Sequence, residues 1–402
     1  MSGAQENSTW APILEDELAD RAWVALRSLG AGITAFTEPV TDLATFWSYV
    51  APALGDDAEV HHDAALDRLG SVRVRDLRGP SLFRGLAGFG WTVMHCIDGF
   101  DELLQIIDTA LIDGLAGSEW RGHYDLISGL TGIGVYFLER GDARLAVTGL
   151  DEILRHLARL AVRTTDGITW HTPPEHIPPG GDRYPSGWFN VGLAHGVPGV
   201  IGLLGKLPRS PQVDELRNGA IDWVLAQRTD NPSRSRFPAF AESPVGRSTR
   251  TAWCYGDLGV AVALWGACAR TGELAKLPEL EAVALAALNR SIDEARLFDG
   301  AFCHGTIGLA HIANRFFHAT RRPEFREAAV RWYAATLELA RPDQGVGGFS
   351  RWGGHGVEDE GWEASPNILD GAAGIGMALA SALTPIEPAW DRLLLVDLPI
   401  AS

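Results

Sequence analysis

Three side chains with metal-binding chemistry, Cys254, Cys303 and His304, stand just before glycine turns of the same kind. The first lies in the stretch Trp-Cys-Tyr-Gly-Asp-Leu-Gly, and the other two lie in Phe-Cys-His-Gly-Thr-Ile-Gly. Two thiolates and one imidazole are a ligand set of catalytic zinc centres, where the fourth position stays open for water or substrate. The sequence therefore predicts a zinc site with three protein ligands.

Each of these residues has a simpler interpretation when it is taken alone. A single cysteine is more often a buried thiol, and a single histidine is more often a hydrogen-bonded core residue. The matched positions in two repeats favour zinc instead. Cys96 and Cys268 lie in apolar stretches and are predicted to be core residues. So few cysteines in 402 residues do not make a disulfide framework, which indicates thiols kept reduced in the cytosol.

The glycine turn recurs six times, which is typical of a repeat architecture. The turns have the form Gly-x-x-Gly and begin at Gly85, Gly129, Gly196, Gly256, Gly305 and Gly371. The residue before each first glycine is polar or ionisable: Arg84, Ser128, His195, Tyr255, His304 and Asp370. Polar residues favour helix starts because they cap free N–H groups, and capping accounts for Ser128 and Asp370. The arginine, the tyrosine and the two histidines favour a functional ring of side chains.

Two kinds of helix alternate between the turns. Residues 150–160, 213–228 and 323–340 have apolar side chains on one face, whereas residues 258–268 and 371–383 are apolar all round and rich in Gly and Ala. An inner ring of small-residue helices inside an outer ring of amphipathic helices satisfies both patterns. We therefore predict an all-α fold, an α/α toroid of about seven hairpins, formed as one domain by residues 1–402.

The repeats cover residues 82–383, and helical patterns at 12–29 and 40–54 are expected to form an N-terminal hairpin (12–54) that completes the ring. Residues 164–190, 229–249 and 341–367 are expected to be irregular loops, with a short strand at 167–171. All three loops precede a glycine turn, so a toroid gathers them at one end, where long loops usually frame a site.

Composition limits the classes of partner. The net charge is −17, which argues against nucleic acid or an anionic membrane as the main partner. The first ten residues lack the basic and apolar regions of a secretory signal, and no uncharged apolar run reaches membrane-spanning length. A cytoplasmic protein without an integral membrane segment is expected.

Three motifs in this order resemble those of lanthionine synthetase C-like cyclases. They are Gly-Leu-Ala-His-Gly-Val-Pro-Gly from Gly192, Trp-Cys-Tyr-Gly from Trp253 and Cys-His-Gly from Cys303. The resemblance implies a toroid of seven inner and seven outer helices with zinc held by Cys254, Cys303 and His304. It also implies that His195 is the catalytic histidine, that Asp125 is its aspartate, and that Tyr255 and Arg250 belong to the active site. A further polar residue of some members has only His311 as a candidate counterpart, and His311 is expected to pack or to form a hydrogen bond within its helix.

The resemblance implies a zinc-dependent cyclase that adds precursor-peptide cysteine thiols to dehydroalanine or dehydrobutyrine and so forms (methyl)lanthionine rings. The implied partners are a dehydrated precursor peptide with a leader, a separate dehydratase and an exporter. Residues 170–188 and 234–240 are candidate peptide contacts or ordinary surface loops.

Two other classes of toroid are disfavoured by the two-cysteine ligand set, and one alternative stays open. Prenyltransferase β-type toroids use Asp, Cys and His as zinc ligands, and toroidal glycosidases would leave the cysteines unexplained. The open alternative is a family relative that binds glutathione or a peptide, or an enzyme that adds thiols, without forming a ring.

Overall fold

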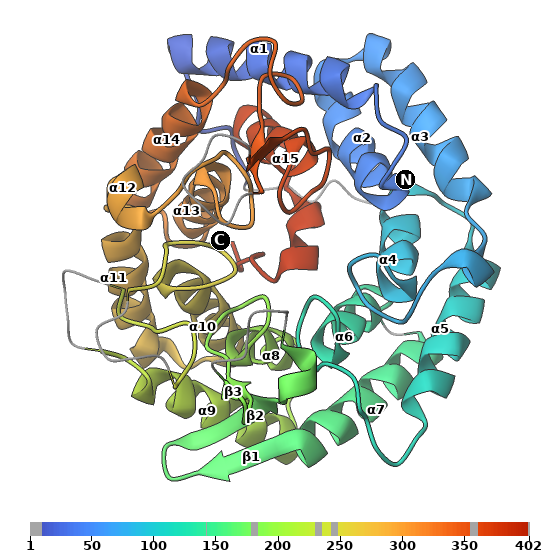
Figure 1. Cartoon of the computed structure of the whole chain (residues 1–402), viewed down its shortest axis with the longest axis vertical. Coiled ribbons are helices and arrows are strands. Elements are labelled where there is room, and N and C mark those ends of the chain that lie inside the picture. Colours follow the sequence, from blue (N-terminus) through green and yellow to red (C-terminus); the bar gives the residue numbers. More distant parts are fainter. Residues whose placement is uncertain are drawn as a thin grey trace. The chain divides into compact units, whose positions relative to one another are not determined.

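The structure is a computed structural model, and it describes residues 10–141, 143–177, 184–229, 235–242, 248–353 and 361–400. Helices dominate the described chain, with a few short strands (Figure 1). The chain divides into two compact units. One consists mainly of residues 72–284, and the other combines the chain up to Ser71 with residues 285–391. The division falls within α11 (Leu277–Leu288). The expectation of a single domain stays a prediction.

In the unit of residues 72–284, the helices that follow glycine turns pack against one another. They are α4 (Leu86–Cys96), α6 (Leu130–Glu139), α8 (Val197–Leu204) and α10 (Asp257–Thr271), and each contacts the next. The first three also pack against the helix that follows them in the chain, respectively α5 (Asp101–Leu115), α7 (Arg144–Leu160) and α9 (Pro211–Ala226). Glycine-turn helices thus alternate with amphipathic ones along the chain.

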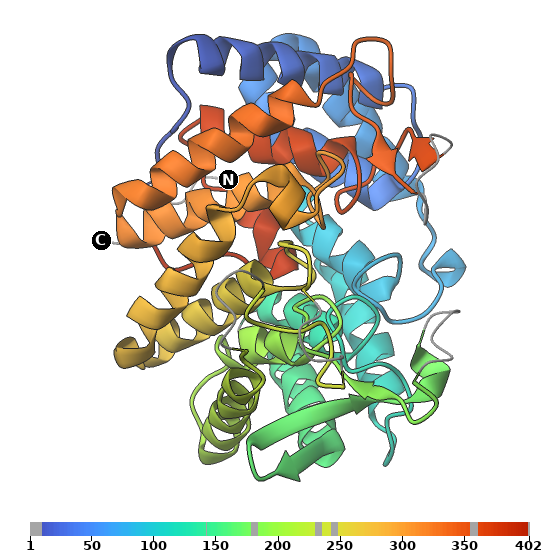
Figure 2. The same cartoon turned by 60° about the vertical axis from the view of Figure 1, so that its left-hand side comes forward.

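The unit that contains both chain ends repeats this alternation. Its helices are α1 (Asp16–Ile33), α2 (Val40–Leu54), α3 (Glu59–Ser71), α12 (Ile292–Ala295), α13 (Thr306–Thr320), α14 (Pro323–Glu338) and α15 (Ala372–Leu383). Figure 2 shows α13 lying along α14, and α15 packs against both α1 and α2. The main partners of α2 are α3 and α15, and α1 contacts α15 and α14. The amphipathic pattern of α3 is weak, and the sequence analysis did not identify this helix.

The two predicted kinds of helix differ in how much of their surface is buried. Every residue of α8 and α15 is buried, whereas α7 buries only Ala146, Gly149, Ile153, His156 and Leu157. A helix that is buried all round needs small residues where neighbours approach, and an added Cβ on Gly205 would meet Ala267 of α10 at 2.6 Å. The composition of each helix therefore matches its place in the fold.

The second glycine of each turn is required by a close approach of the backbone. A Cβ added to Gly88, Gly132, Gly199, Gly259, Gly308 or Gly374 would collide with the carbonyl oxygen six residues earlier. The recurring Gly-x-x-Gly motif thus specifies one local geometry, in which the chain folds over the helix start. Successive turns are also hydrogen-bonded: Leu126 N–H donates to Ala194 O at 3.2 Å, and Cys303 N–H donates to Leu369 O at 2.7 Å.

A small antiparallel sheet lies in the segment between α7 and α8. Its strands are β1 (Ala161–Thr164), β2 (Gly167–Thr172) and β3 (Trp188–Phe189), in the order β1-β2-β3, with Ala161 opposite Trp170. The expected short strand at 167–171 is confirmed. The expectation that 164–190 is irregular is wrong for this part, because β2 packs on α9 and pairs on both edges. A second pair, β4 (Arg351–Trp352) with β5 (Trp362–Glu363), lies in the 341–367 segment.

The first helix begins four residues later than the pattern at 12–29 suggested. The preceding residues bind to the end of α15 instead of extending α1: the N–H groups of Ile13 and Leu14 donate to Ala382 O, and the indole of Trp10 donates to Ser381 O. Trp10 also stacks on His318, with ring centroids 3.8 Å apart. Tertiary hydrogen bonds have replaced the helical ones.

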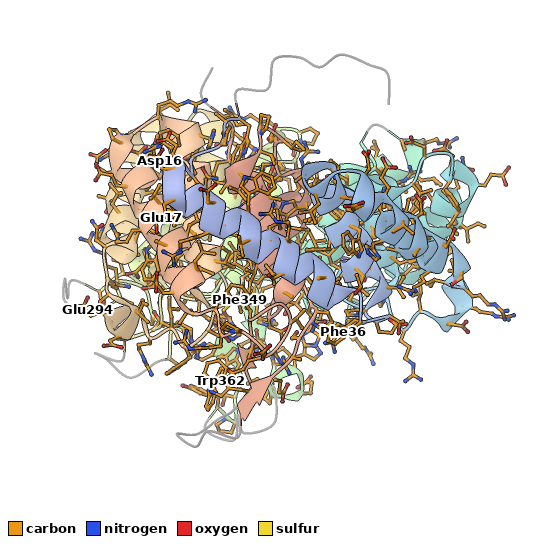
Figure 3. The ribbon with its side chains drawn as sticks, turned by 90° about the horizontal axis from the view of Figure 1, so that it is seen from above. Asp16, Glu17, Phe36, Glu294, Phe349 and Trp362 are labelled. Carbon is orange, nitrogen blue, oxygen red and sulfur yellow. The ribbon has the colours of Figure 1, made fainter. Side chains whose placement is uncertain are left out.

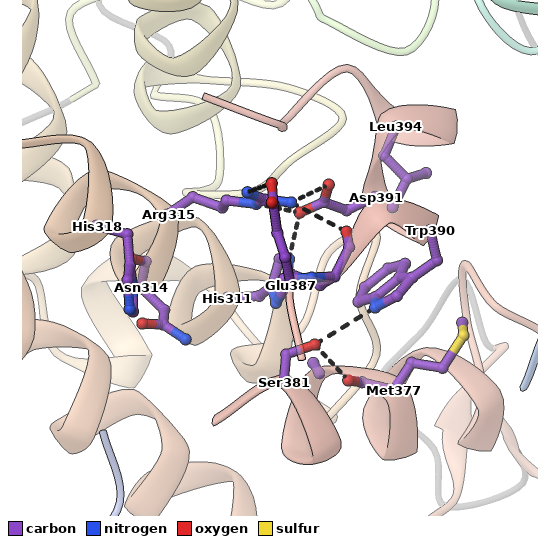
Figure 4. Close-up of polar contacts among 12 residues, drawn as sticks. His311, Asn314, Arg315, His318, Met377, Ser381, Glu387, Trp390, Asp391 and Leu394 are labelled. Carbon is purple, nitrogen blue, oxygen red and sulfur yellow. Dashed lines mark hydrogen bonds and ion pairs between the residues drawn. The ribbon is translucent and has the colours of Figure 1, made fainter. Parts of the chain in front are cut away.

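A buried ionic cluster ties α13 to the segment after α15 (Figure 4). Asp391, which is fully buried, accepts hydrogen bonds from His311 Nε2 at 2.7 Å and from Arg315 Nε at 2.6 Å. Arg315 also donates to Glu387 and to the carbonyl of Pro388. His311 therefore bonds to the chain after α15, which adds to the packing role that the sequence suggested for it.

Candidate active site

A histidine and an aspartate from two successive glycine turns form a hydrogen-bonded pair. Asp125 precedes α6 and His195 precedes α8, and the bond from Leu126 N–H to Ala194 O brings the turns together. His195 Nδ1 donates to Asp125 Oδ2 at 2.6 Å, while Asp125 Oδ1 accepts the N–H of Ser128 at 2.7 Å. Because Asp125 is buried and fixed on both oxygens, it can hold the imidazole in one orientation with Nε2 left for a substrate.

The electrostatics of this pair suit proton transfer. Burial acts to lower the pKa of His195, but the hydrogen bond and the charge of Asp125 outweigh it, and the pKa is raised above its ordinary value. The side chain keeps 44 % of its surface exposed. A histidine that is accessible and readily protonated near neutral pH can both take up and return a proton.

Tyr255 lies beside this pair and is oriented by a neighbouring amide. Asn190 Nδ2 donates to the Tyr255 hydroxyl oxygen at 2.9 Å, and Asn190 Oδ1 accepts the N–H of Gly192 at 2.8 Å. The rings of Tyr255 and His195 have centroids 6.5 Å apart. Since the phenol oxygen serves as an acceptor for Asn190, its own O–H can donate to another group.

These side chains line one cavity of about 420 Å³. Its walls are His123, Tyr124, Asp125, Ser128, Thr172, His176, Trp188, Asn190, His195, Phe240 and Tyr255. Three of the four predicted catalytic residues thus share a pocket of the size that usually binds small ligands. Arg250 is half-buried, is not among the described lining residues and has no hydrogen bond or ion pair with them. Its catalytic role stays a prediction.

Two polar wall residues, His123 and Asn190, were not predicted from the sequence. The ring of His123 stacks on that of His176 at 4.1 Å, and burial, with a smaller effect from the neighbouring histidines, lowers the pKa of His123 against the opposing charge of Asp125. Each of these two wall residues stands six places before the first glycine of its turn, Gly129 or Gly196, and its carbonyl accepts the N–H that follows that glycine, so aligning this position of the repeats could have indicated both residues. Trp188 and Phe240 fall in the segments that the sequence marked as candidate peptide contacts.

The predicted zinc ligands are close together. One donor atom each from Cys254, Cys303 and His304 lies within 4.8 Å of the others, and none of the cysteines forms a disulfide. Cys254 is buried and the other two residues are half-buried. Donor atoms around a tetrahedral zinc ion lie about 3.5–4 Å apart, so the group fits zinc after small side-chain shifts. Within the described ranges, no fourth His, Cys, Asp or Glu joins the group.

A larger cavity, of about 830 Å³, runs along α1 but contains none of the predicted site residues. Acidic side chains, among them Glu17 and Asp20, line it together with apolar ones such as Val24, Leu337 and Phe349. Figure 3 shows Glu17 on α1 and Phe349 in the segment after α14. This lining has no cysteine or histidine among its described residues and none of the predicted site residues, so the smaller cavity is the candidate active site.

Comparison with known proteins places the chain among proteins of one family. The family description that matches is "Lanthionine synthetase C-like protein", over residues 46–395. A relative from Lactococcus lactis subsp. lactis, the nisin biosynthesis protein NisC, is 23% identical over 263 residues. That match spans 59% of this chain and 62% of the relative.

A solved structure of nisin cyclase has a TM-score of 0.72 to this chain, with 18% sequence identity. The match covers 92% of this chain and 97% of the other. At this identity the likeness shows the fold, and it confirms the predicted all-α class and α/α toroid. Among the described residues, no helix has the length and hydropathy needed to cross a bilayer.

Proposed function

Because the chain belongs to the lanthionine synthetase C-like family, we propose that it is a zinc-dependent lanthipeptide cyclase. In the proposed reaction, a cysteine thiol of a peptide adds across the Cα=Cβ bond of dehydroalanine or dehydrobutyrine in the same peptide. The S–Cβ bond forms, the π electrons pass to the enolate of the adjacent carbonyl, and Cα then receives a proton. The thiol must lose its proton before it attacks. The reaction needs no oxidant or reductant.

The observation that carries the proposal is the group of Cys254, Cys303 and His304, with no fourth donor among the described residues. Two thiolates and one imidazole suit zinc and leave one position for an exogenous ligand. Bound there, zinc would supply a means to deprotonate the substrate thiol, whose ordinary pKa near ~8.5 leaves little thiolate at neutral pH. With zinc bound, the two cysteine ligands would make the site electron-rich and would preserve the nucleophilicity of a substrate thiolate.

Proton transfer is assigned to His195. Its Nε2 takes the thiol proton or returns one to Cα, while Asp125 holds the opposite nitrogen and stabilises the imidazolium. The raised pKa of His195 supports a group that is protonated for part of the cycle. Tyr255 donates its O–H to the developing enolate oxygen, with Asn190 fixing the phenol. Arg250 is proposed to stabilise the enolate or the helix starts.

The proposed substrate is a precursor peptide with a leader, already dehydrated by a separate dehydratase. An exporter for the product and a cytoplasmic location complete the proposal. The nisin-related names among the relatives support a peptide substrate. Neither nucleic acid nor a membrane is proposed as a partner.

The test is ring closure in a synthetic peptide that contains one dehydroalanine and one cysteine. After incubation with the zinc-loaded protein, an alkylating reagent is added and the peptide mass is measured. Ring closure protects the cysteine from alkylation, whereas binding alone does not. If the cysteine stays fully alkylatable while the peptide binds, the protein is a binding relative and the cyclase proposal is wrong.

Two cysteine variants test the metal part. Cys303→Ala is expected to lose both zinc, measured by atomic absorption, and ring closure. Cys268→Ala is the matched control, because Cys268 lies in the core of α10, where burial raises the pKa of its thiol to about 11. It should keep one zinc per chain and full activity. Equal zinc content in Cys303→Ala and the unmodified protein would contradict the ligand assignment.

A further inference from the structure

One wall of the active-site cavity comes from segments that the proposed chemistry does not use. Trp188 belongs to β3, and Phe240 lies in the described segment 235–242. Their rings stack with centroids 4.0 Å apart and an interplanar angle of 14°. The rings of Phe240 and Tyr255 make a T-shaped contact with centroids 5.9 Å apart, and Tyr255 in turn neighbours His195. A continuous aromatic surface thus leads from β3 to His195, the proposed proton carrier.

Backbone pairing holds this wall in place. Thr172 of β2 is opposite Trp188, and Asn190 forms an isolated antiparallel bridge with Phe240. Hydrogen bonds of 2.9 Å run from Val191 N–H to Ala239 O and from Ala241 N–H to Phe189 O. The segment 239–241 therefore continues the sheet beyond β3. An aromatic wall on paired strands is preorganised and loses little conformational entropy when it binds a ligand.

The same wall carries a polar atom that needs an acceptor. Trp188 is 91% buried, and within the described part of the chain its indole N–H has no hydrogen-bond partner. Buried indole N–H groups usually find an acceptor, because an unsatisfied buried donor is costly. The backbone carbonyl of a peptide is an acceptor that occurs at every residue of the proposed substrate.

The charges of the cavity set the kind of side chain that fits. Among its described lining residues, Asp125 is the one carboxylate, it is paired with His195, and no Lys or Arg is present. A charged peptide side chain would lose water there without gaining an opposite charge. Aromatic rings instead offer flat apolar surface and favourable ring–ring contacts.

We infer that Trp188 and Phe240 form a substrate subsite, which binds an apolar, preferably aromatic, side chain next to a reacting residue of the peptide. The indole N–H of Trp188 donates to a backbone carbonyl of the same peptide segment. The inference rests on the proposed cyclase function, and it makes the subsite a determinant of which cysteine and dehydro residue are joined.

The experiment uses the full-length, zinc-loaded protein and synthetic peptides with one dehydroalanine and one cysteine. Phe or Ser is placed in turn at each position that flanks the two reacting residues. At one position at least, the unmodified protein should prefer Phe by about tenfold or more in kcat/KM, mainly through KM. No preference at any flanking position, with ring closure intact, would overturn the subsite while leaving the cyclase function standing.

Three variants test which residues cause the preference for Phe. Phe240→Ala, at a half-buried position, should reduce the Phe preference to within about twofold of none. Trp188→Phe keeps a ring but removes the donor, so KM should rise about three- to tenfold for Phe and Ser peptides alike. Phe189→Ala is the control, since Phe189 neighbours Trp188 but packs on His171 and Trp223 outside the cavity lining. An unchanged preference in Phe240→Ala, or an unchanged KM in Trp188→Phe, contradicts the corresponding contact.

Binding measurements distinguish failure of the subsite from failure of the cyclase function. Affinities of the same peptides with alanine in place of dehydroalanine are measured by calorimetry, where no ring can form. A Phe preference in binding without ring closure in the reactive peptides would retain the subsite and reject the cyclase function. Equal affinities for Phe and Ser peptides at every position would reject the subsite whether or not rings form.

Discussion

Two His–Asp pairs in this protein have nearly the same hydrogen-bond length and opposite surroundings. His195 donates to Asp125 at 2.6 Å, and His311 bonds to Asp391 at 2.7 Å. The first imidazole keeps 44 % of its side-chain surface exposed and lines the cavity, whereas His311 and Asp391 are fully buried. The pKa of His195 is raised, and the pKa of His311 is lowered by burial despite its carboxylate.

The difference in pKa comes mainly from burial and, to a smaller extent, from a third charge. His311 is fully buried, and Arg315, which donates to both oxygens of Asp391, adds a smaller opposition to protonation of the imidazole. Among the described residues, no arginine donates to Asp125, and its charge and hydrogen bond raise the pKa of His195. Equal residue types therefore give a proton carrier in one place and a structural tie in the other.

The largest expected effect is at the exposed pair. His195→Ala should reduce ring closure by about 10²- to 10⁴-fold, the range typical of a lost general acid or base, with zinc content unchanged. Peptide turnover by mass spectrometry and metal analysis on the same sample check this. His171→Ala, a half-buried histidine of β2 outside the cavity lining, should keep turnover within about twofold. Normal ring closure by His195→Ala would remove the distinction between the two pairs.

At the buried pair the expected effect is on stability. Asp391→Asn leaves Arg315 buried without its carboxylate and should lower the free energy of unfolding by about 3–5 kcal/mol. Urea denaturation measures the change. Glu387→Gln is the matched control, because Glu387 contacts the same arginine but is 38 % exposed, and it should change stability by under about 1 kcal/mol. A similar loss in both variants would mean that burial does not decide the outcome.

Acid should lower the free energy of unfolding through a buried histidine on α13, the helix that carries His311. His318, one turn beyond Asn314 on α13, receives the N–H of Ala11 at Nε2, and burial lowers its pKa to about 4. Since the unfolded chain binds the proton near pH 6.5 and the folded chain does not, stability is full above pH 6.5 and falls towards pH 4. This one group would account for a loss on the order of 3 kcal/mol.

Urea midpoints between pH 7 and pH 4 test this dependence. His318→Gln should be less stable than the unmodified protein at pH 7 and lose less on acidification. His61→Gln, an exposed position, should follow the unmodified protein at every pH. Parallel curves for His318→Gln and the unmodified protein would show that His318 is not the titrating group.

The smallest expected effect concerns the amide that orients Tyr255. Asn190→Ala should lower kcat about three- to tenfold with little change in KM, because one hydrogen bond to the phenol is lost. In a Tyr255→Phe background the same substitution should have no further effect on kcat. Additive losses would mean that Asn190 acts on something other than the Tyr255 hydroxyl.

Repetition explains how much of the fold and site could be predicted. Because the Gly-x-x-Gly turn repeats six times, the sequence alone aligns Cys254 with Cys303 and aligns His195 with Tyr255 and His304, and uniform apolar runs indicate the buried helices. The fold class is confirmed by the likeness to a solved toroid. Segments with a weak hydrophobic pattern were not predicted correctly. Helix α3 was not identified, and the predicted start of α1 is too early because residues between Trp10 and Leu14 hydrogen-bond to the end of α15.

The sequence by itself determined where the helix starts with polar residues lie. Each turn needs a glycine at its second Gly position, because a carbonyl oxygen of the preceding chain lies where a Cβ would be, and this local requirement recurs in every repeat. It could not distinguish the two His–Asp pairs, since Arg315, Asp391 and the burial around them come from chain segments about 75 residues apart. It also could not show that Trp188 and Phe240 stack in one wall of the cavity. Those outcomes depend on desolvation and on neighbours supplied by distant segments, which only the tertiary structure brings together.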